Sequence, residues 1–203
     1  MTYRNFKLID LQQEFGLKIE RKNLFDTQQI KQNKPSAWLT ETLQRSTKMA
    51  ISTEKALSEY IISPILSEVE MNNKDRISLF SGEVLNADRS RKLNGEVDFI
   101  FVQVANAIEI QAPLLCITEA KLHEGLERAI PQAAAQMIGA QVFNQKHQQQ
   151  LPIIYGAITS GRTWLFLQLS QQTLLVDTDI YYLDNLPTIL GIFQHLLKPQ
   201  PLV

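Results

Sequence analysis

An acid and a base stand two positions apart near the middle of the chain. Glu119 and Lys121 end the apolar run that starts at Leu114, and this run predicts a β-strand. Side chains at positions i and i+2 of a strand point to the same face. The carboxylate and the ammonium group should therefore emerge side by side at the carboxyl end of the strand. Taken alone, the pair is a weak signal for catalysis, because an exposed ion pair that contributes little to stability explains it better.

A second acid gives this pair a chemical context. Asp98 lies early in the preceding predicted strand, residues 97–102. If the two strands pair antiparallel, the start of one lies beside the end of the other, and Asp98 approaches Glu119. Two converging carboxylates repel each other, and a divalent cation such as Mg²⁺ or Mn²⁺, which prefers oxygen ligands, removes that repulsion.

The same groups could support hydrolysis of a phosphodiester bond. The backbone carbonyl of residue 120 could add a metal ligand, and Lys121 could orient or help to deprotonate a water molecule. The metal would lower the pKa of that water and offset charge on a pentavalent phosphate. This chemistry requires a carboxylate pair and a base in one place, as the spacing predicts.

The surrounding pattern resembles the PD-(D/E)XK nuclease superfamily, which includes restriction endonucleases and Holliday-junction resolvases. The matching residues are Gly95-x-x-Asp98, an apolar strand ending in Glu119-Ala-Lys121, and a helix that opens with Gln132. The resemblance covers about residues 52–180. It implies Asp98 and Glu119 as ligands of Mg²⁺ or Mn²⁺, Lys121 as the catalytic lysine, and nucleic acid, in the first place DNA, as the partner. The chain also resembles uncharacterised bacterial, especially cyanobacterial, proteins, a narrower match that implies no activity.

The resemblance implies two further site residues. The superfamily usually has an acid on its first core helix that reaches the metal directly or through water, and Glu59 matches this position best. Glu59 is equally read as a solvent-facing acid. Related nucleases often carry a glutamine on the helix after the catalytic strand, and Gln132 in its first turn fits better than Gln136, which a polar helix face explains as well. The acids that compete with Glu59 are Glu54, Glu68 and Glu70.

The predicted elements follow an order that fits this resemblance. The pattern runs helix, helix, three strands, helix, three strands, helix, which indicates an α/β fold. The resemblance implies a restriction endonuclease-like αβββαβ core, a central mixed sheet flanked by helices, with an N-terminal helical extension. Pro64 is unfavourable inside the second helix and predicts a kink there. The expected helices are about 37–49, a helix capped by Ser52 or Thr53, 131–146 and 186–197, and the expected strands are 77–85, 97–102, 114–121, 153–159, 163–169 and 173–177.

Two parts are expected along the chain, an N-terminal helical extension of residues 1–50 and a nuclease-like domain of residues 51–203. Gly16 is expected to end a short helix, and the polar residues 26–36 predict a loop. Residues 1–50 hold nine lysines and arginines against five acids. This basic excess could bind a phosphate backbone, and a solvated helix surface explains it as well.

Composition limits the classes of protein to which this chain can belong. The net charge of the 203 residues is −1, so binding to nucleic acid would depend on a local basic patch. Cys116 is the single cysteine, which excludes an internal disulfide and fits a reducing compartment. Its place in an apolar run predicts that it lies in the core. No apolar stretch approaches the ~20 residues of a membrane span, and the N-terminus has no signal-peptide core, so a cytoplasmic protein is expected.

Histidine and cysteine show no spacing typical of a zinc site. His123 could approach the site or be an ordinary loop histidine. The leading hypothesis is a Mg²⁺-dependent nuclease. The alternatives are a catalytically inactive module of the same fold that binds nucleic acid or protein, and a subunit whose recognition part is another chain. A homodimer is one arrangement that the resemblance implies, because many such cores dimerise to cut two strands.

Overall fold

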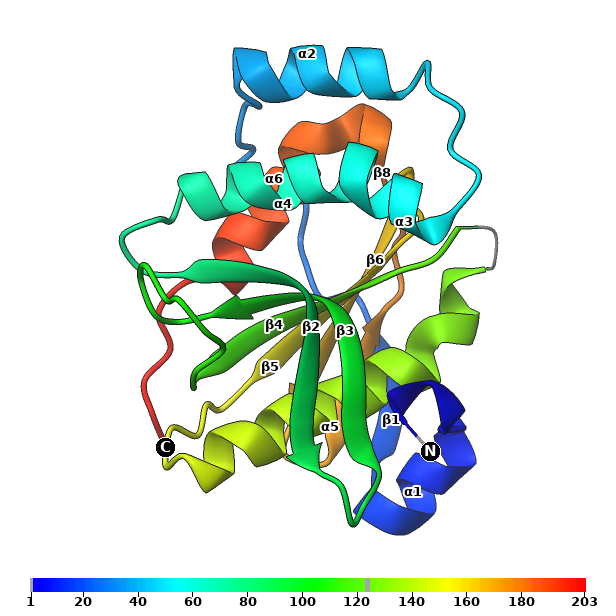
Figure 1. Ribbon diagram of the computed structural model, residues 1–203, viewed down its shortest axis with the longest axis vertical. Helices are drawn as coiled ribbons and strands as arrows, with labels where there is room; N and C mark the ends of the chain where they lie inside the picture. The colour runs from blue at the N-terminus through cyan, green and yellow to red at the C-terminus, as the bar shows by residue number, and fades with distance from the viewer. Residues whose placement is uncertain (1, 123–124) are drawn as a thin grey trace.

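The computed structural model describes residues 2–122 and 125–203. The chain has an α/β fold in which helices flank one open, mixed sheet (Figure 1). The strand order is β1-β7-β6-β5-β4-β3-β2, and β8 pairs with β6. The pairs β1–β7 and β4–β5 are parallel, and the other neighbouring strands are antiparallel.

The strands are β1 Lys18–Lys22, β2 Ser78–Asp88, β3 Leu93–Val102, β4 Leu114–Ala120, β5 Ile154–Thr159, β6 Thr163–Ser170, β7 Thr173–Asp177 and β8 Tyr181–Tyr182. The α-helices are α1 Leu8–Phe15, α2 Ala37–Ser46, α3 Glu54–Leu57, α4 Ser63–Met71, α5 Ile130–Lys146 and α6 Leu186–Leu196. Short helical turns are η1 Tyr3–Asn5, η2 Ser58–Ile62, η3 Leu126–Ala129 and η4 Leu183–Asn185. The predicted strands and helices after residue 36 are all present, with ends that differ by a few residues.

Helices cover both faces of the sheet. Helix α5 packs against β2, β4 and β5, and the small side chains of its inner face let it lie close to them (Figure 1). Phe193 of α6 makes edge contacts with Trp164 and Phe166 of β6 on the other face. Every residue of β4 is buried, because this central strand is covered on both sides.

The second predicted helix is continuous but irregular. The Thr53 hydroxyl accepts a hydrogen bond from the Ala56 N–H at 3.0 Å and so caps α3, which confirms one of the two expected caps. The backbone then widens into the π-helical turn η2 directly before Pro64 in the first turn of α4. Such a turn accommodates a residue that cannot donate an N–H bond inside a helix.

The N-terminal region differs from the helical extension expected for residues 1–50. Helix α1 ends at Gly16, as predicted, but residues 18–22 form β1, which extends the sheet beside β7. The ring of Tyr3 packs against Gly139 of α5, and its hydroxyl donates to the Leu85 carbonyl at 3.1 Å.

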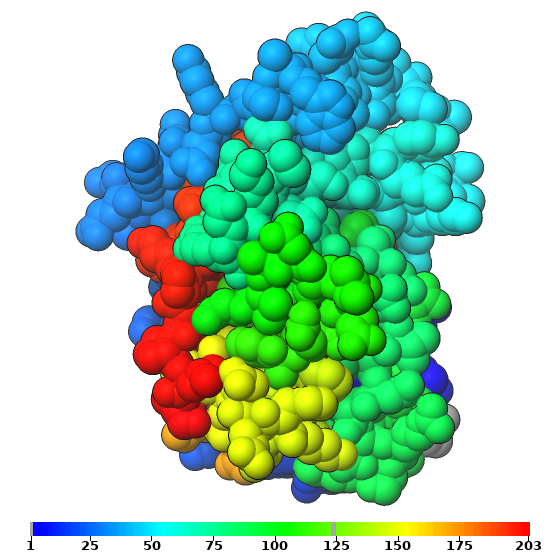
Figure 2. Space-filling view, turned by 60° about the vertical axis from the view of Figure 1, so that its left-hand side comes forward, coloured from blue at the N-terminus to red at the C-terminus, as the bar shows by residue number. Residues whose placement is uncertain are grey.

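The loop before α2 also packs on the rest of the fold. The Asn33 N–H donates to the Pro187 carbonyl at 3.0 Å. In the space-filling view this blue segment lies against the red C-terminal residues (Figure 2). Residues 2–50 therefore share one sheet and one set of packing contacts with the remainder of the described chain.

Candidate functional site

Antiparallel pairing of β3 and β4 brings Asp98 beside the end of β4, as expected. Phe99 lies opposite Thr118 in the register of the two strands. Asp98 precedes Phe99 on β3, and one of its carboxylate oxygens accepts a hydrogen bond from the Ala120 N–H at 2.8 Å. Asp98 thus stands at the point of the sheet where Glu119 and Lys121 emerge.

Glu119 is almost fully buried, with 1% of its surface exposed, and three side chains donate to its carboxylate. Its Oε1 accepts from the Lys121 Nζ at 2.7 Å and from the Gln132 Nε2 at 2.5 Å. Its Oε2 accepts from the Gln136 Nε2 at 2.7 Å. Strand β4 provides the acid, the residue after it provides the cation, and the first two turns of α5 provide the amides.

Each of the two acids affects the ionisation of the other. Burial is the largest cause that raises the pKa of Glu119 and the charge of Asp98 is the second, while Lys121 and the Gln136 amide oppose them, and the resulting pKa is about 7. Burial also raises the pKa of Asp98. The Ala120 N–H and the charge of Lys121 oppose that increase. Burial and mutual repulsion therefore disfavour simultaneous ionisation of the two carboxyl groups, and a divalent cation beside them would reduce that repulsion.

The structure places the four candidate acids of the first core helix differently. Glu59 is exposed, and its carboxylate lies 3.9 Å from the Lys55 ammonium group in an i,i+4 ion pair. The charge of Glu54, at the start of α3, contributes to the raised pKa of Asp98. Of the two acids, Glu54 is therefore the one with an electrostatic link to the site.

The other two acids have structural partners. The buried Glu68 accepts from the Ser36 N–H at 2.7 Å and from the Ser36 hydroxyl at 2.8 Å, which ties the start of α2 to α4. Glu70 accepts from the Leu79 N–H at 2.8 Å, which ties α4 to β2. Neither carboxylate has a hydrogen bond to the Asp98–Glu119 pair.

Sequence reasoning gave too little weight to one residue and missed another. Gln136 is fully buried and donates to Glu119 as Gln132 does, and the i,i+4 spacing on α5 was the available signal. Its Oε1 is buried without a hydrogen-bond partner in the described chain. Arg4 of η1 contributes a positive charge that lowers the pKa of Asp98, and no local motif marks this residue. His123 lies outside the described residues.

The carboxylates of the site are oxygen ligands of the kind that Mg²⁺ and Mn²⁺ prefer. The described residues contain no group of three or more histidines, cysteines and acids placed to hold a metal. Mg²⁺, however, is commonly held by one or two carboxylates while it keeps several waters. Asp98 and Glu119 fit that requirement, provided that Lys121 or Gln132 releases a Glu119 oxygen.

Comparison with known protein families finds no family model that matches this chain, and comparison with curated proteins finds no matching relative. Within the described ranges, none of the helices is both long and apolar enough to cross a bilayer.

Proposed function

We propose that this protein is a divalent-metal-dependent nuclease that hydrolyses DNA phosphodiester bonds on a restriction endonuclease-like core. The observation that carries the proposal is the convergence of Asp98, Glu119 and Lys121 at the end of β4, with Gln132 reaching in from α5. The order of elements supports it as well, because a helix precedes the three strands β2–β4 and another follows them.

Each residue has a distinct role in this proposal. Asp98 and Glu119 would hold Mg²⁺ or Mn²⁺, which when bound supplies positive charge that acidifies water and stabilises a phosphorane-like transition state. Lys121, whose side chain is 15% exposed against 1% for Glu119, is the more accessible partner of the ion pair and would orient a nucleophilic water or contact the phosphate. Gln132 and Gln136 fix the orientation of the Glu119 carboxylate.

The test is cleavage of supercoiled, linear and branched DNA with Mg²⁺ or Mn²⁺ by the complete chain. We expect nicking or cutting that requires the metal and is lost in Glu119→Ala and Lys121→Ala. Glu59→Gln is the matched control, since this exposed acid pairs with Lys55. Activity that survives both site substitutions would refute the proposal.

One observation favours a second candidate, a catalytically inactive module of the same fold that binds nucleic acid or protein. Both Glu119 oxygens already accept hydrogen bonds from side chains of the same chain, one of them the Lys121 ammonium group, so this carboxylate has its partners without a metal ion. Calorimetry separates the two functions. An absence of Mn²⁺ binding at millimolar concentration, together with an absence of cleavage, would favour the binding module.

A further inference from the structure

A groove begins one residue beyond Lys121 and runs beneath α2. It consists of two adjoining cavities of about 330 and 600 Å³ that share Thr47 and Arg162 as lining residues. Leu122 lines the smaller cavity, at the end nearer the candidate site. Leu43 of α2 and Leu186 of α6 both line the larger cavity. The groove thus connects the carboxyl end of β4 with the space between α2 and α6.

Arg162 stands where the two cavities meet. It follows Gly161 in the β5–β6 turn, where φ is +76° and an added Cβ would collide with Leu57 and contact Ile61. The turn is fixed further because the Gly161 N–H donates to the Thr159 hydroxyl at 2.8 Å. Within the described residues the Arg162 guanidinium forms no hydrogen bond and no ion pair, and its side chain is exposed. A rigid turn therefore presents an uncompensated cation to the groove.

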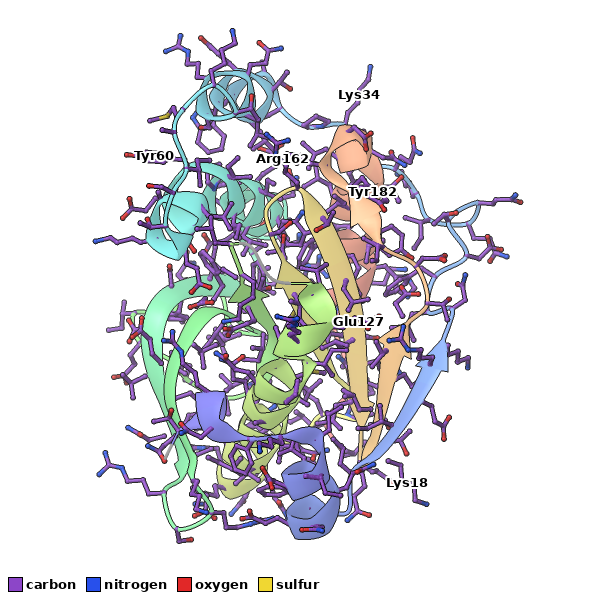
Figure 3. All side chains as sticks on the ribbon, turned by 90° about the vertical axis from the view of Figure 1, so that its right-hand side faces the viewer. Lys18, Lys34, Tyr60, Glu127, Arg162 and Tyr182 are labelled. Carbon is purple, nitrogen blue, oxygen red and sulfur yellow. The ribbon has the colours of Figure 1, made fainter. Side chains whose placement is uncertain are left out.

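An aromatic ring lies beside this cation. Tyr182 of β8 pairs with Thr163, and the Leu183 N–H donates to the Arg162 carbonyl at 2.8 Å. The Tyr182 side chain is 56% exposed, and Figure 3 shows it near Arg162 at the same end of the sheet. The larger cavity is also lined by the aliphatic residues Leu43, Leu183 and Leu186 and by the acid Asp184.

We propose that this groove binds a single-stranded nucleic-acid segment next to the cleaved phosphate, with one base stacked on Tyr182 and one phosphate on Arg162. This inference rests on the proposed nuclease function. A base presents an apolar face that suits the aliphatic walls, and stacking on an aromatic ring does not depend on the base's identity. Asp184, which lines the same cavity, disfavours a second phosphate there.

The test measures binding without cleavage. A fluorescently labelled ten-nucleotide oligodeoxyuridylate, and its ribonucleotide counterpart with the same bases, are titrated with the full chain in EDTA, and anisotropy gives the Kd. We expect Arg162→Gln and Tyr182→Ala each to weaken binding about tenfold, and Tyr182→Phe to bind like the wild type. Arg162→Gln should also reduce the slope of log Kd against log salt by about 0.7, which a purely structural role would not do. Arg89→Gln, in the β2–β3 turn, removes an equal charge elsewhere and should change neither quantity.

The outcomes separate this inference from the proposed function. No binding of either oligonucleotide by the wild type, or equal binding by Arg162→Gln and Arg89→Gln, would overturn the groove proposal even if duplex DNA is cleaved. Binding that depends on Arg162 and Tyr182, without metal-dependent cleavage, would support the groove and contradict the nuclease. A preference for one oligonucleotide would assign the strand as DNA or RNA.

Discussion

Two buried carboxylates stand at the ends of strands in the same sheet, and their partners differ in kind. Asp177 ends β7, accepts from the Leu24 and Asp179 N–H groups at 3.3 and 3.2 Å, and accepts from the Tyr181 hydroxyl at 3.0 Å. Glu119 of β4 accepts from one lysine and two glutamines. Burial raises the pKa of both acids.

The comparison teaches that burial and a raised pKa do not by themselves mark a functional site. The donors to Asp177 are two backbone groups and a tyrosine within its own turn and the segment beside it, so they cannot be withdrawn without disturbing the fold. The donors to Glu119 are the ends of long side chains, so none of these hydrogen bonds belongs to the backbone of the fold. Glu119 also has a second carboxyl group, Asp98, near enough to shift its pKa, whereas the acid that affects Asp177 is the exposed Asp179 of its own turn.

The largest expected difference between the two acids is in catalysis. Glu119→Gln should lower the rate of Mg²⁺-dependent cleavage by roughly a thousandfold, because it removes a charged metal ligand. Asp177→Asn should keep the rate within about threefold of the wild type, since its role is to hold a turn. The rates are compared at saturating metal, and an equal loss in both variants would erase the proposed distinction.

A pH dependence of stability should follow from Glu119. Its pKa is raised from 4.5 to about 7, so between these values the folded protein binds more protons than the unfolded chain. The free energy of unfolding should therefore fall as the pH rises through this window, by on the order of 3 kcal/mol for this group.

Urea denaturation at pH 5 and pH 8 measures this change, and Glu119→Gln should flatten the profile. If the wild type is instead more stable at pH 8 by a margin that Glu119→Gln abolishes, the carboxylate is held ionised in the folded protein and its pKa is lowered, not raised.

Removal of the Asp177 carboxylate should lower stability more than removal of a glutamine amide that contacts Glu119. Asp177→Ala leaves two backbone N–H groups and the Tyr181 hydroxyl without their acceptor, which should cost about 2 kcal/mol. Denaturant unfolding measures the loss, with the exposed Asp179→Ala as the comparison. Equal stability of the two variants would mean that solvent replaces the Asp177 carboxylate.

The smallest effect should come from Gln136. Gln136→Leu removes one donor from Glu119 and should weaken Mn²⁺ binding about tenfold in calorimetry, as loss of a group that orients a ligand typically does. Stability should change little, because leucine also removes the unpaired buried Oε1. The control is Gln145→Leu at an exposed position of the same helix. Unchanged affinity in Gln136→Leu would show that Gln132 and Lys121 suffice to hold the carboxylate.

The sequence allowed most of the fold to be predicted because its patterns are local. Rough alternation marked β2, apolar runs rich in β-branched and aromatic residues marked other strands such as β4, and the small residues of α5 indicated close packing on the sheet. Strand β1 could not be predicted, since Ile19 is its single apolar residue and its partner β7 lies about 150 positions away.

Prediction of the site was limited in a similar way. The convergence of Asp98, Glu119 and Lys121 follows from strand pairing and from i,i+2 spacing, and Gln132 was expected from the resemblance to the nuclease superfamily. The choice between Glu54 and Glu59 depends on η2, because its π-helical turn changes the residue spacing from which helix faces are assigned. The charge of Arg4 reaches Asp98 through tertiary packing of η1, which leaves no pattern in the sequence.

The short strand β1 has a consequence for how the molecule behaves in a crowded solution. Its sequence, Lys-Ile-Glu-Arg-Lys, places charged side chains along an outer edge of the sheet, where an unpaired backbone could otherwise recruit a strand from another molecule. Strand β7, which pairs with β1 in the same sheet, carries the consecutive apolar residues Leu174, Leu175 and Val176. A chain shortened to begin after Lys22 would offer that apolar edge directly to its neighbours, so the first 22 residues also act as a barrier against aggregation.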